Sequence, residues 1–247
     1  MKILSIGNSF SADAHVYLHS LAKERGIDLD TVNLAIGGCS LETHWNNIVN
    51  NSVNYLLGLN GGEEWEKDLV SIEQILKSEA FDAVTLQQVS GYSGQVETYQ
   101  PYLNDIIAYV RKYQPNAPLY IHRTWAYEID SQHGDFPKYD CNQEKMHKAI
   151  CEATNQIAQE VGATLILAGD VIDALRHRVP KFDYKNGGES VCRDGFHLST
   201  YARYAVSLAW LATFTKKPVT PMTFMELDSV TNREICNIVN EIVIGKQ

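Results

Sequence analysis

The chain has 247 residues, of which 45% are hydrophobic and 21% charged, and its formal net charge at pH 7 is -9. This composition is typical of a globular protein with a sizeable core, and the length corresponds to one large domain or two small ones. The negative charge argues against a nucleic acid or an anionic membrane as partner, because both would repel the chain. No stretch is long and apolar enough to span a bilayer.

The cysteines indicate a reducing compartment. Their number is odd and their spacing does not match that of metal ligands, so a disulfide framework is not expected. The first residues are typical of a buried strand, which leaves no room for a signal peptide and predicts a cytoplasmic location. The five residues are Cys39, Cys141, Cys151, Cys192 and Cys236.

Short apolar runs alternate with longer amphipathic ones along the chain. The apolar runs lack a clean alternation of period two, as is typical of parallel strands that are buried on both faces. In chain order, the predicted elements are a strand at 2–6, a helix at 12–25, a strand at 30–36, a helix at 63–79, a strand at 83–87, a helix at 97–113, a strand at 118–123, a helix at 143–161, a strand at 163–167, and helices at 199–215 and 226–243.

This alternation predicts an α/β fold with helices on both faces of one sheet. We expect a flavodoxin-like three-layer α/β/α sandwich with a five-stranded parallel sheet of order 2-1-3-4-5. No repeat or linker divides the chain, so residues 1–247 are predicted to form a single domain. Three long connections, 38–62, 125–142 and 178–193, are expected to surround one cleft at the carboxyl ends of the strands, where ligands bind in such sheets.

A serine lies where the first strand turns into a helix. Gly7, Asn8 and Ser9 follow the strand directly, so the Ser9 hydroxyl is expected above the sheet. Its backbone N–H would belong to the unsatisfied N-terminus of the helix. Without support from another segment, a helix cap would be the preferred explanation of this turn.

The supporting segment lies almost 190 residues later, at Asp194 and His197. An aspartate three residues before a histidine can accept the ring N–H and leave the other ring nitrogen free to face a serine. In isolation, the same two residues would be interpreted as a helix start. Together with Ser9 they favour nucleophilic acyl chemistry, because a serine hydroxyl is a poor nucleophile until a base takes its proton.

Two further strand ends carry unusual residues. Gly37 and Gly38 follow the second strand and permit a turn that leaves a backbone N–H free for a developing oxyanion, although a purely structural turn is an equal alternative. The third strand ends in Gln87 and Gln88, and two amides at the end of a buried strand suggest a polar task.

These segments resemble the conserved blocks of the SGNH (GDSL-like) hydrolase superfamily. The first block of that family is Gly-Asp-Ser, and residues Gly7 to Ser9 match it with asparagine in the middle. The glycine of the second block corresponds to Gly38, and the final Asp-x-x-His corresponds to Asp194 to His197. The likeness spans nearly the whole chain in order and spacing.

The third block departs from the family pattern. It normally reads Gly-x-Asn-Asp and supplies an asparagine to the oxyanion hole, whereas this chain has Gln87 and Gln88. A glutamine there resembles the sialate and xylan acetylesterase-like branches. A little-characterised bacterial branch with Gly-Asn-Ser and Gln-Gln is the most similar. The resemblance implies the flavodoxin-like sheet, catalysis without metal or cofactor, and ester substrates.

The resemblance also implies a role for each matched residue. Ser9 would attack the acyl carbon, His197 would take its proton, and Asp194 would orient the imidazole. The N–H groups of Ser9 and Gly38 would hold the oxyanion together with one side-chain amide, for which we expect Gln88.

The end of the fourth strand supplies a candidate for substrate contact. Trp125 could form a pocket wall because a flat aromatic ring packs on a sugar or acyl face, although a core position is nearly as well supported. We also expect Gln87 and Asn8 to contact the substrate. The remaining histidines lack paired ligand spacing, so no metal site is predicted.

The sequence therefore predicts an ester hydrolase that acts on a small-molecule substrate. The leading hypothesis is a serine esterase that removes a small acyl group, acetyl in particular, from a carbohydrate. A lipid-type or thioester acyl hydrolase is an alternative, but the long connections are rich in Asn, Asp, Tyr and Trp rather than Leu and Phe. A catalytically silent carbohydrate-binding relative is a further alternative, although it would be expected to lack one of the three catalytic residues.

Overall fold

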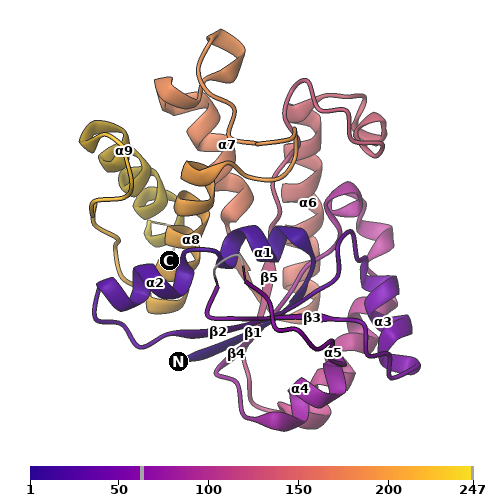
Figure 1. Cartoon of the computed structure of the whole chain (residues 1–247). Helices are drawn as coiled ribbons and strands as arrows, with labels where there is room; N and C mark the ends of the chain where they lie inside the picture. The colour runs from indigo at the N-terminus through magenta and orange to yellow at the C-terminus, as the bar shows by residue number, and fades with distance from the viewer. Residues whose placement is uncertain (62–63, 246–247) are drawn as a thin grey trace.

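The structure, a computed structural model, describes residues 1–61 and 64–245 and contains a six-stranded sheet with helices on both faces (Figure 1). All neighbouring strands are parallel except β3, which runs antiparallel to β2. In spatial order the strands are β3 (Leu56–Leu59), β2 (Asp30–Ala35), β1 (Lys2–Gly7), β4 (Ala83–Leu86), β5 (Leu119–His122) and β6 (Thr164–Ile166).

The α/β class and the order of the five predicted strands are confirmed, but the sheet has one strand more than predicted. The additional strand is β3, at the edge beside β2, inside a segment that the sequence predicted as a connection. It is only four residues long, and Leu56 and Leu59 are more than 40% exposed. A short, half-exposed edge strand gives too weak a hydrophobic pattern to be identified from the sequence.

Nine α-helices lie in the described chain, and one has the predicted bounds. The predicted helix at 12–25 is broken in two and begins earlier, and the one at 63–79 is reduced to its second half, with residues 62–63 outside the described part. Two short helices were not predicted. The helices are α1 (Ser9–His15), α2 (Leu18–Glu24), α3 (Leu41–Val49), α4 (Ile72–Ser78), α5 (Tyr102–Tyr113), α6 (Gln143–Val161), α7 (Ala168–Arg178), α8 (Thr200–Thr215) and α9 (Ser229–Val239).

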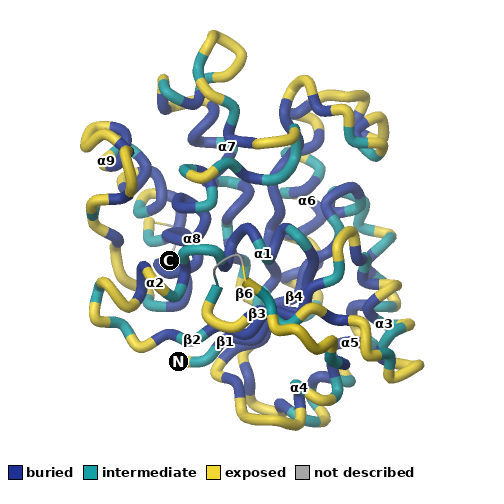
Figure 2. The backbone as a smooth tube through the Cα atoms, in the orientation of Figure 1, coloured by how far each residue is buried: buried dark blue, intermediate teal, exposed yellow. Residues whose placement is uncertain are grey.

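Successive residues of the central strand β1 point to opposite faces of the sheet and pack into two separate hydrophobic layers. Ile3 packs into a layer that includes residues of α1, α2, α7, α8 and α9, whereas Leu4 and Ile6 pack into a layer with residues of α3, α4 and α5. Helix α6 contributes to both layers. The four inner strands β2, β1, β4 and β5 are almost entirely buried, whereas the edge strands β3 and β6 are partly exposed (Figure 2). This is the three-layer arrangement predicted from strands that are apolar on both faces.

The strand register brings the candidate site residues to one edge of the sheet. Gly7 at the end of β1 pairs with Ala35 of β2, and Ile6 pairs with Leu86 of β4. The chain segments that follow these three strands therefore leave the sheet side by side. Within residues 1–61 and 64–245, no helix combines the length and hydrophobicity that a membrane crossing requires.

Three histidines are built into this fold as neutral groups. His15, His44 and His122 are each at most 2% exposed. Burial lowers the pKa of each of them from 6.5 to about 3. Folding therefore excludes protons that the unfolded chain would bind at mildly acidic pH.

We expect stability to fall as the pH drops below about 6.5 and to continue falling toward pH 3. Between these values the unfolded state binds more protons than the folded state. Each buried histidine therefore lowers the free energy of unfolding by about 1.4 kcal/mol for every unit by which the pH falls. Urea unfolding of the wild type and of His44→Gln at several pH values measures this slope. In the variant, the slope should be smaller by about the contribution of one histidine. Asn46→Gln, at an exposed position of the same helix, changes no titratable group and should retain the wild-type slope. An unchanged slope in His44→Gln would contradict the assignment.

Candidate active site

The turn that carries Ser9 is held by Asn8. The Asn8 side chain caps α1 by accepting a hydrogen bond from the Phe10 N–H at 3.0 Å, and its amide donates to the Cys39 carbonyl at 3.1 Å. Asn8 is 1% exposed, so it acts mainly as a link between the turns after β1 and β2. Ser9 is the first residue of α1, as the sequence predicted for a strand-to-helix junction.

The turn after β2 requires glycine at one position. Gly38 has φ +65°, a left-handed conformation that glycine adopts without steric cost. The next residue closes the turn, because the Cys39 N–H donates to the Ile36 carbonyl at 3.1 Å. Gly38 lines the same pocket as Asn8 and Ser9.

Asp194 and His197 form a closed hydrogen-bonded pair. The His197 Nδ1 lies 2.7 Å from one carboxylate oxygen of Asp194, and the other oxygen accepts the N–H groups of His197 and Phe196. Partial burial alone would raise the pKa of Asp194, but these hydrogen bonds outweigh it and lower the pKa below its usual value. The carboxylate is therefore ionised and fixes the ring with Nε2 turned away from it.

Ser9 and His197 line one pocket, which we call the Ser9 pocket. Its volume is about 190 Å³, smaller than the roughly 300–1,000 Å³ of typical sites for drug-sized ligands. Asp194 lies behind His197 and outside this lining. The pocket is lined by Asn8, Ser9, Phe10, Gly37, Gly38, Val89, Ser90, His133, Phe196 and His197.

Gln88 does not have the role that the sequence predicted. Its amide nitrogen donates both to the carbonyl and to the hydroxyl of Thr98, at 3.0 and 3.1 Å. Its amide oxygen accepts the N–H groups of Leu41 and Val89. Gln88 therefore ties three chain segments together, and its donor points away from the Ser9 pocket. The prediction of an oxyanion donor at this position is corrected accordingly.

Gln87 supports the Ser9 turn through a hydrogen bond to Asn8 and does not line the pocket. Its amide nitrogen donates to Asn8 Oδ1 at 2.7 Å, and its amide oxygen accepts the Nδ1–H of His122 at 2.9 Å. All three side chains are at most 2% exposed. The expectation of substrate contact is therefore wrong for Gln87, because a neighbouring side chain occupies each end of its amide.

Trp125 is a core residue and not a pocket wall. Its ring is 0% exposed and stacks on Phe10 with the ring centroids 4.2 Å apart. The indole N–H donates to the Phe196 carbonyl at 2.7 Å. Trp125 thus braces the neighbours of both Ser9 and His197, and the expectation of direct substrate contact is corrected.

Five pocket residues were not predicted as site residues, namely Phe10, Val89, Ser90, His133 and Phe196. Ser90 follows the Gln87–Gln88 pair and shares a hydrogen bond with the hydroxyl of Tyr127 at 2.9 Å. His133 and Phe196 pack edge to face with the ring centroids 4.7 Å apart. Phe196 lies inside the Asp-x-x-His segment, so its position could have been inferred. His133 comes from a long connection whose path no local pattern indicates.

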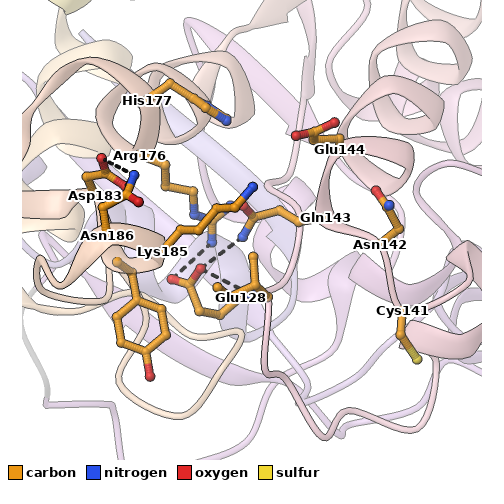
Figure 3. A pocket seen from close by; sticks show the side chains of 12 residues that line it. Glu128, Cys141, Asn142, Gln143, Glu144, Arg176, His177, Asp183, Lys185 and Asn186 are labelled. Atoms are coloured by element: carbon orange, nitrogen blue, oxygen red, sulfur yellow. Dashed lines mark hydrogen bonds and ion pairs between the residues drawn. The ribbon is translucent and has the colours of Figure 1, made fainter.

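A larger cleft of about 620 Å³, lined by residues that include Glu128, Gln143 and Arg176, shares no lining residue with the Ser9 pocket (Figure 3). At its floor, Glu128 is 3.7 Å from the Arg176 guanidinium and accepts a hydrogen bond from Gln143 at 2.9 Å. The Glu128 N–H donates to the Gly195 carbonyl at 2.8 Å. The floor is thus occupied by groups that bind one another and support the Asp194–His197 segment.

The cysteines near the site are structural. The thiols of Cys39 and Cys192 are free, and burial raises the pKa of each to about 12. Neither therefore supplies a thiolate nucleophile at neutral pH. Among the residues that the structure describes, no group of three His, Cys, Asp or Glu side chains is arranged to hold a metal ion.

Comparisons with known proteins identify relatives of the whole chain. The family model described as "Domain of unknown function (DUF4886)" matches residues 2–241. The crystal structure of a DUF4886 family protein from Bacteroides uniformis is 32% identical, with a TM-score of 0.90, over 100% of this chain and 96% of that chain. No curated protein matches the chain.

More distant structures share the fold. One is a putative SGNH hydrolase from Slackia heliotrinireducens, 21% identical with a TM-score of 0.56 over 87% of this chain and 98% of that chain. Another is an acetylxylan esterase from Geobacillus stearothermophilus, 12% identical with a TM-score of 0.54 over 85% of this chain and 92% of that chain. The predicted resemblance to SGNH hydrolases is thus confirmed at the level of the fold.

Variants of Gln87 and Gln88 can distinguish a structural role of these side chains from a direct role as oxyanion donors. We expect Gln88→Ala to lower stability by about 1–3 kcal/mol, because buried N–H and carbonyl groups lose their partners, with kcat changed only a few-fold. Gln87→Ala should lower kcat more, since it releases the Asn8 cap beneath Ser9. Thermal melts and ester kinetics on both variants measure this difference. If Gln88→Ala retained wild-type stability and lost about 10²-fold in kcat, Gln88 would be an oxyanion donor after all.

Proposed function

We propose that this chain, which belongs to the DUF4886 family, is a serine esterase that removes a small acyl group from a polar alcohol. The observation that carries the proposal is the joint lining of one pocket by Ser9 and His197, with His197 held by Asp194 at 2.7 Å. A nucleophile on one chain segment and a base with an orienting acid on another are the components of a catalytic triad.

The proposed reaction has two steps at Ser9. His197 Nε2 takes the hydroxyl proton as Ser9 Oγ attacks the acyl carbon, and Asp194 stabilises the imidazolium that forms. The alcohol then leaves with the proton from His197, and an acyl group remains on Ser9. A water molecule, deprotonated by the same nitrogen, releases the acid and restores the serine.

Backbone N–H groups are the proposed oxyanion donors. The N–H of Ser9 belongs to the first turn of α1, where helix geometry leaves N–H groups without intrahelical partners. Gly38 lines the same pocket in a conformation that favours glycine, and its N–H is the second proposed donor. Donors of this kind act when negative charge develops on the acyl oxygen and therefore raise kcat.

The size and lining of the Ser9 pocket support an acetyl-sized acyl group. The pocket volume is about 190 Å³, and Phe10, Val89 and Phe196 supply apolar walls beside the nucleophile. The alcohol is proposed to be a carbohydrate. Support for this part comes from the shared fold with an acetylxylan esterase and from the polar long connections around the site.

The triad assignment predicts covalent labelling at Ser9. A fluorophosphonate probe should label the wild type, and Ser9→Ala should abolish labelling. Ser9→Ala and His197→Ala should each lower kcat by about 10⁴–10⁶-fold, and Asp194→Asn by less, because the residues act as a unit and the acid is the most dispensable. Labelling that survives Ser9→Ala would eliminate the proposed mechanism, and an unlabelled wild type would favour a silent carbohydrate-binding relative.

The pocket size predicts selectivity for short acyl chains. In a series of p-nitrophenyl esters, kcat/KM should be highest for acetate and should fall by at least roughly tenfold by the octanoate, since a longer chain exceeds the pocket. Acetylated xylo-oligosaccharides serve as the carbohydrate arm of the same assay. A maximum at octanoate or longer would instead support the lipid-type alternative.

A further inference from the structure

Asp13 is a buried carboxylate that joins the two halves of the candidate active site. It lies on α1 one turn after Ser9 and is 2% exposed. One carboxylate oxygen accepts the backbone N–H of Leu198 at 2.7 Å, and Leu198 directly follows His197. The nucleophile segment is thus linked through one side chain to the segment that carries the base.

Two arginines complete the contacts of this carboxylate. Arg193 Nη1 lies 3.0 and 3.2 Å from its two oxygens, and Arg203 Nε on α8 lies 2.8 Å from one of them. Charge-assisted hydrogen bonds of this kind are stronger than neutral ones and are less screened when buried. The carboxylate therefore has a matched set of donors rather than a single exposed ion pair.

Arg193 extends the link across the whole Asp194–His197 segment. Its backbone N–H donates to the His197 carbonyl at 2.8 Å, and its guanidinium also donates to the Leu198 carbonyl. The segment is thereby closed into a loop whose two ends, Arg193 and Leu198, both bind Asp13. Movement of the loop relative to α1 would break several of these bonds at once.

The hydrogen bonds of Asp13 fix the position of α1 relative to the loop that carries His197. They do not involve the side chains of Ser9 or His197. The hydrogen bond between Asp194 and His197 orients the imidazole within its own loop and does not involve α1. The His197 ring also lies near the Phe10 ring of α1, with the centroids 6.0 Å apart, but this contact is not a hydrogen bond and does not fix the position of the loop. The distance between Ser9 and His197 instead depends on how α1 and the loop are fixed to each other. In addition, Ser207 on α8 donates to the Ala14 carbonyl of α1, which anchors the helix on the same side.

We propose that Asp13 is a positioning residue that sets the placement of His197 relative to Ser9. The inference rests on the proposed function, because it needs Ser9 as nucleophile and His197 as base. A misplacement of about 1 Å between reacting groups can cost about 10²-fold in rate. Loss of the Asp13 charge should therefore slow the chemical step more than it weakens substrate binding.

The experiment compares fluorophosphonate labelling rates and p-nitrophenyl acetate kinetics in folded variants at a temperature well below unfolding. Asp13→Asn keeps an acceptor for Leu198 but loses the charge, and should lower both the labelling rate and kcat by roughly 10- to 100-fold. KM should stay within about threefold, because the contact is not made to substrate. Arg193→Ala should give a smaller loss, and the double variant should be no slower than Asp13→Asn, since both break one link.

The matched control is Asp170→Asn, which breaks another partly buried ion pair, with Arg123 at 2.7 Å. The guanidinium of Arg123 also binds Thr154 and Asn155 of α6. The control variant should lose stability but label within about threefold of the wild-type rate. Asp13→Asn labelling at the wild-type rate, or equal slowing in Asp170→Asn, would overturn the inference. If Asp13→Asn does not fold, Arg193→Ala is tested in its place, because the Arg193 side chain is 41% exposed and its removal should be tolerated. Labelling of Arg193→Ala at the wild-type rate would then overturn the proposal.

Failure of the proposed function would be visible before any Asp13 variant is compared. An unlabelled wild type, or labelling that persists in Ser9→Ala, would overturn both the mechanism and the role of Asp13. A wild type that labels at Ser9, together with an unimpaired Asp13→Asn, would overturn the positioning role alone.

Discussion

The candidate site depends on one constraint, the alignment of parallel strand ends at a single edge of the sheet. Because β1, β2 and β4 are in register, the turns after them emerge together and bring Asn8, Gly38 and Gln87 to one place. Only the Asp194–His197 segment does not follow a strand of this sheet. It is held by side chains, Asp13 among them, and by the backbone N–H of Glu128, which donates to the Gly195 carbonyl at 2.8 Å.

Buried polar side chains supply this support from several directions. His122, Gln87 and Asn8 form a chain of hydrogen bonds beneath the Ser9 turn. Trp125 packs under Phe10 and binds the carbonyl of Phe196, and so contacts both segments. Buried polar groups are costly unless they are paired, and the amides of Gln87 and Asn8 have partners for both their oxygen and their nitrogen. These bonds therefore also favour one conformation of the Ser9 turn.

The sequence was sufficient for the parts of the fold that local patterns determine. Strands buried on both faces predicted the parallel core and its order, and the Asp-x-x-His spacing predicted the bonded pair of Asp194 and His197. The edge strand β3 and the short helices α3 and α7 were missed because they lie in segments that resemble connections. Their formation depends on packing against the sheet rather than on their own periodicity.

The side-chain assignments that proved wrong share one cause. For Gln87, Gln88 and Trp125, the sequence predicted the strand end correctly but could not predict which neighbour each polar group would meet. Thr98, the partner of the Gln88 amide, lies ten residues further along the chain in a short 3₁₀ helix. Contacts of this kind follow from the path of a long connection, which composition and spacing do not determine.

The bonds of Asp13 also have a consequence for the order of events during synthesis. They join residues 180 to 190 positions apart, so they belong to the most non-local contacts of the chain. Forming them requires closure of a very long loop, which is entropically costly and late in folding. A ribosome-bound chain that ends before Asp194 lacks the proposed base, His197, and its link to Asp13, although the Ser9 turn has already been synthesised. In the proposed mechanism, Ser9 therefore lacks its base until residues 194–203 have been synthesised and have packed against α1.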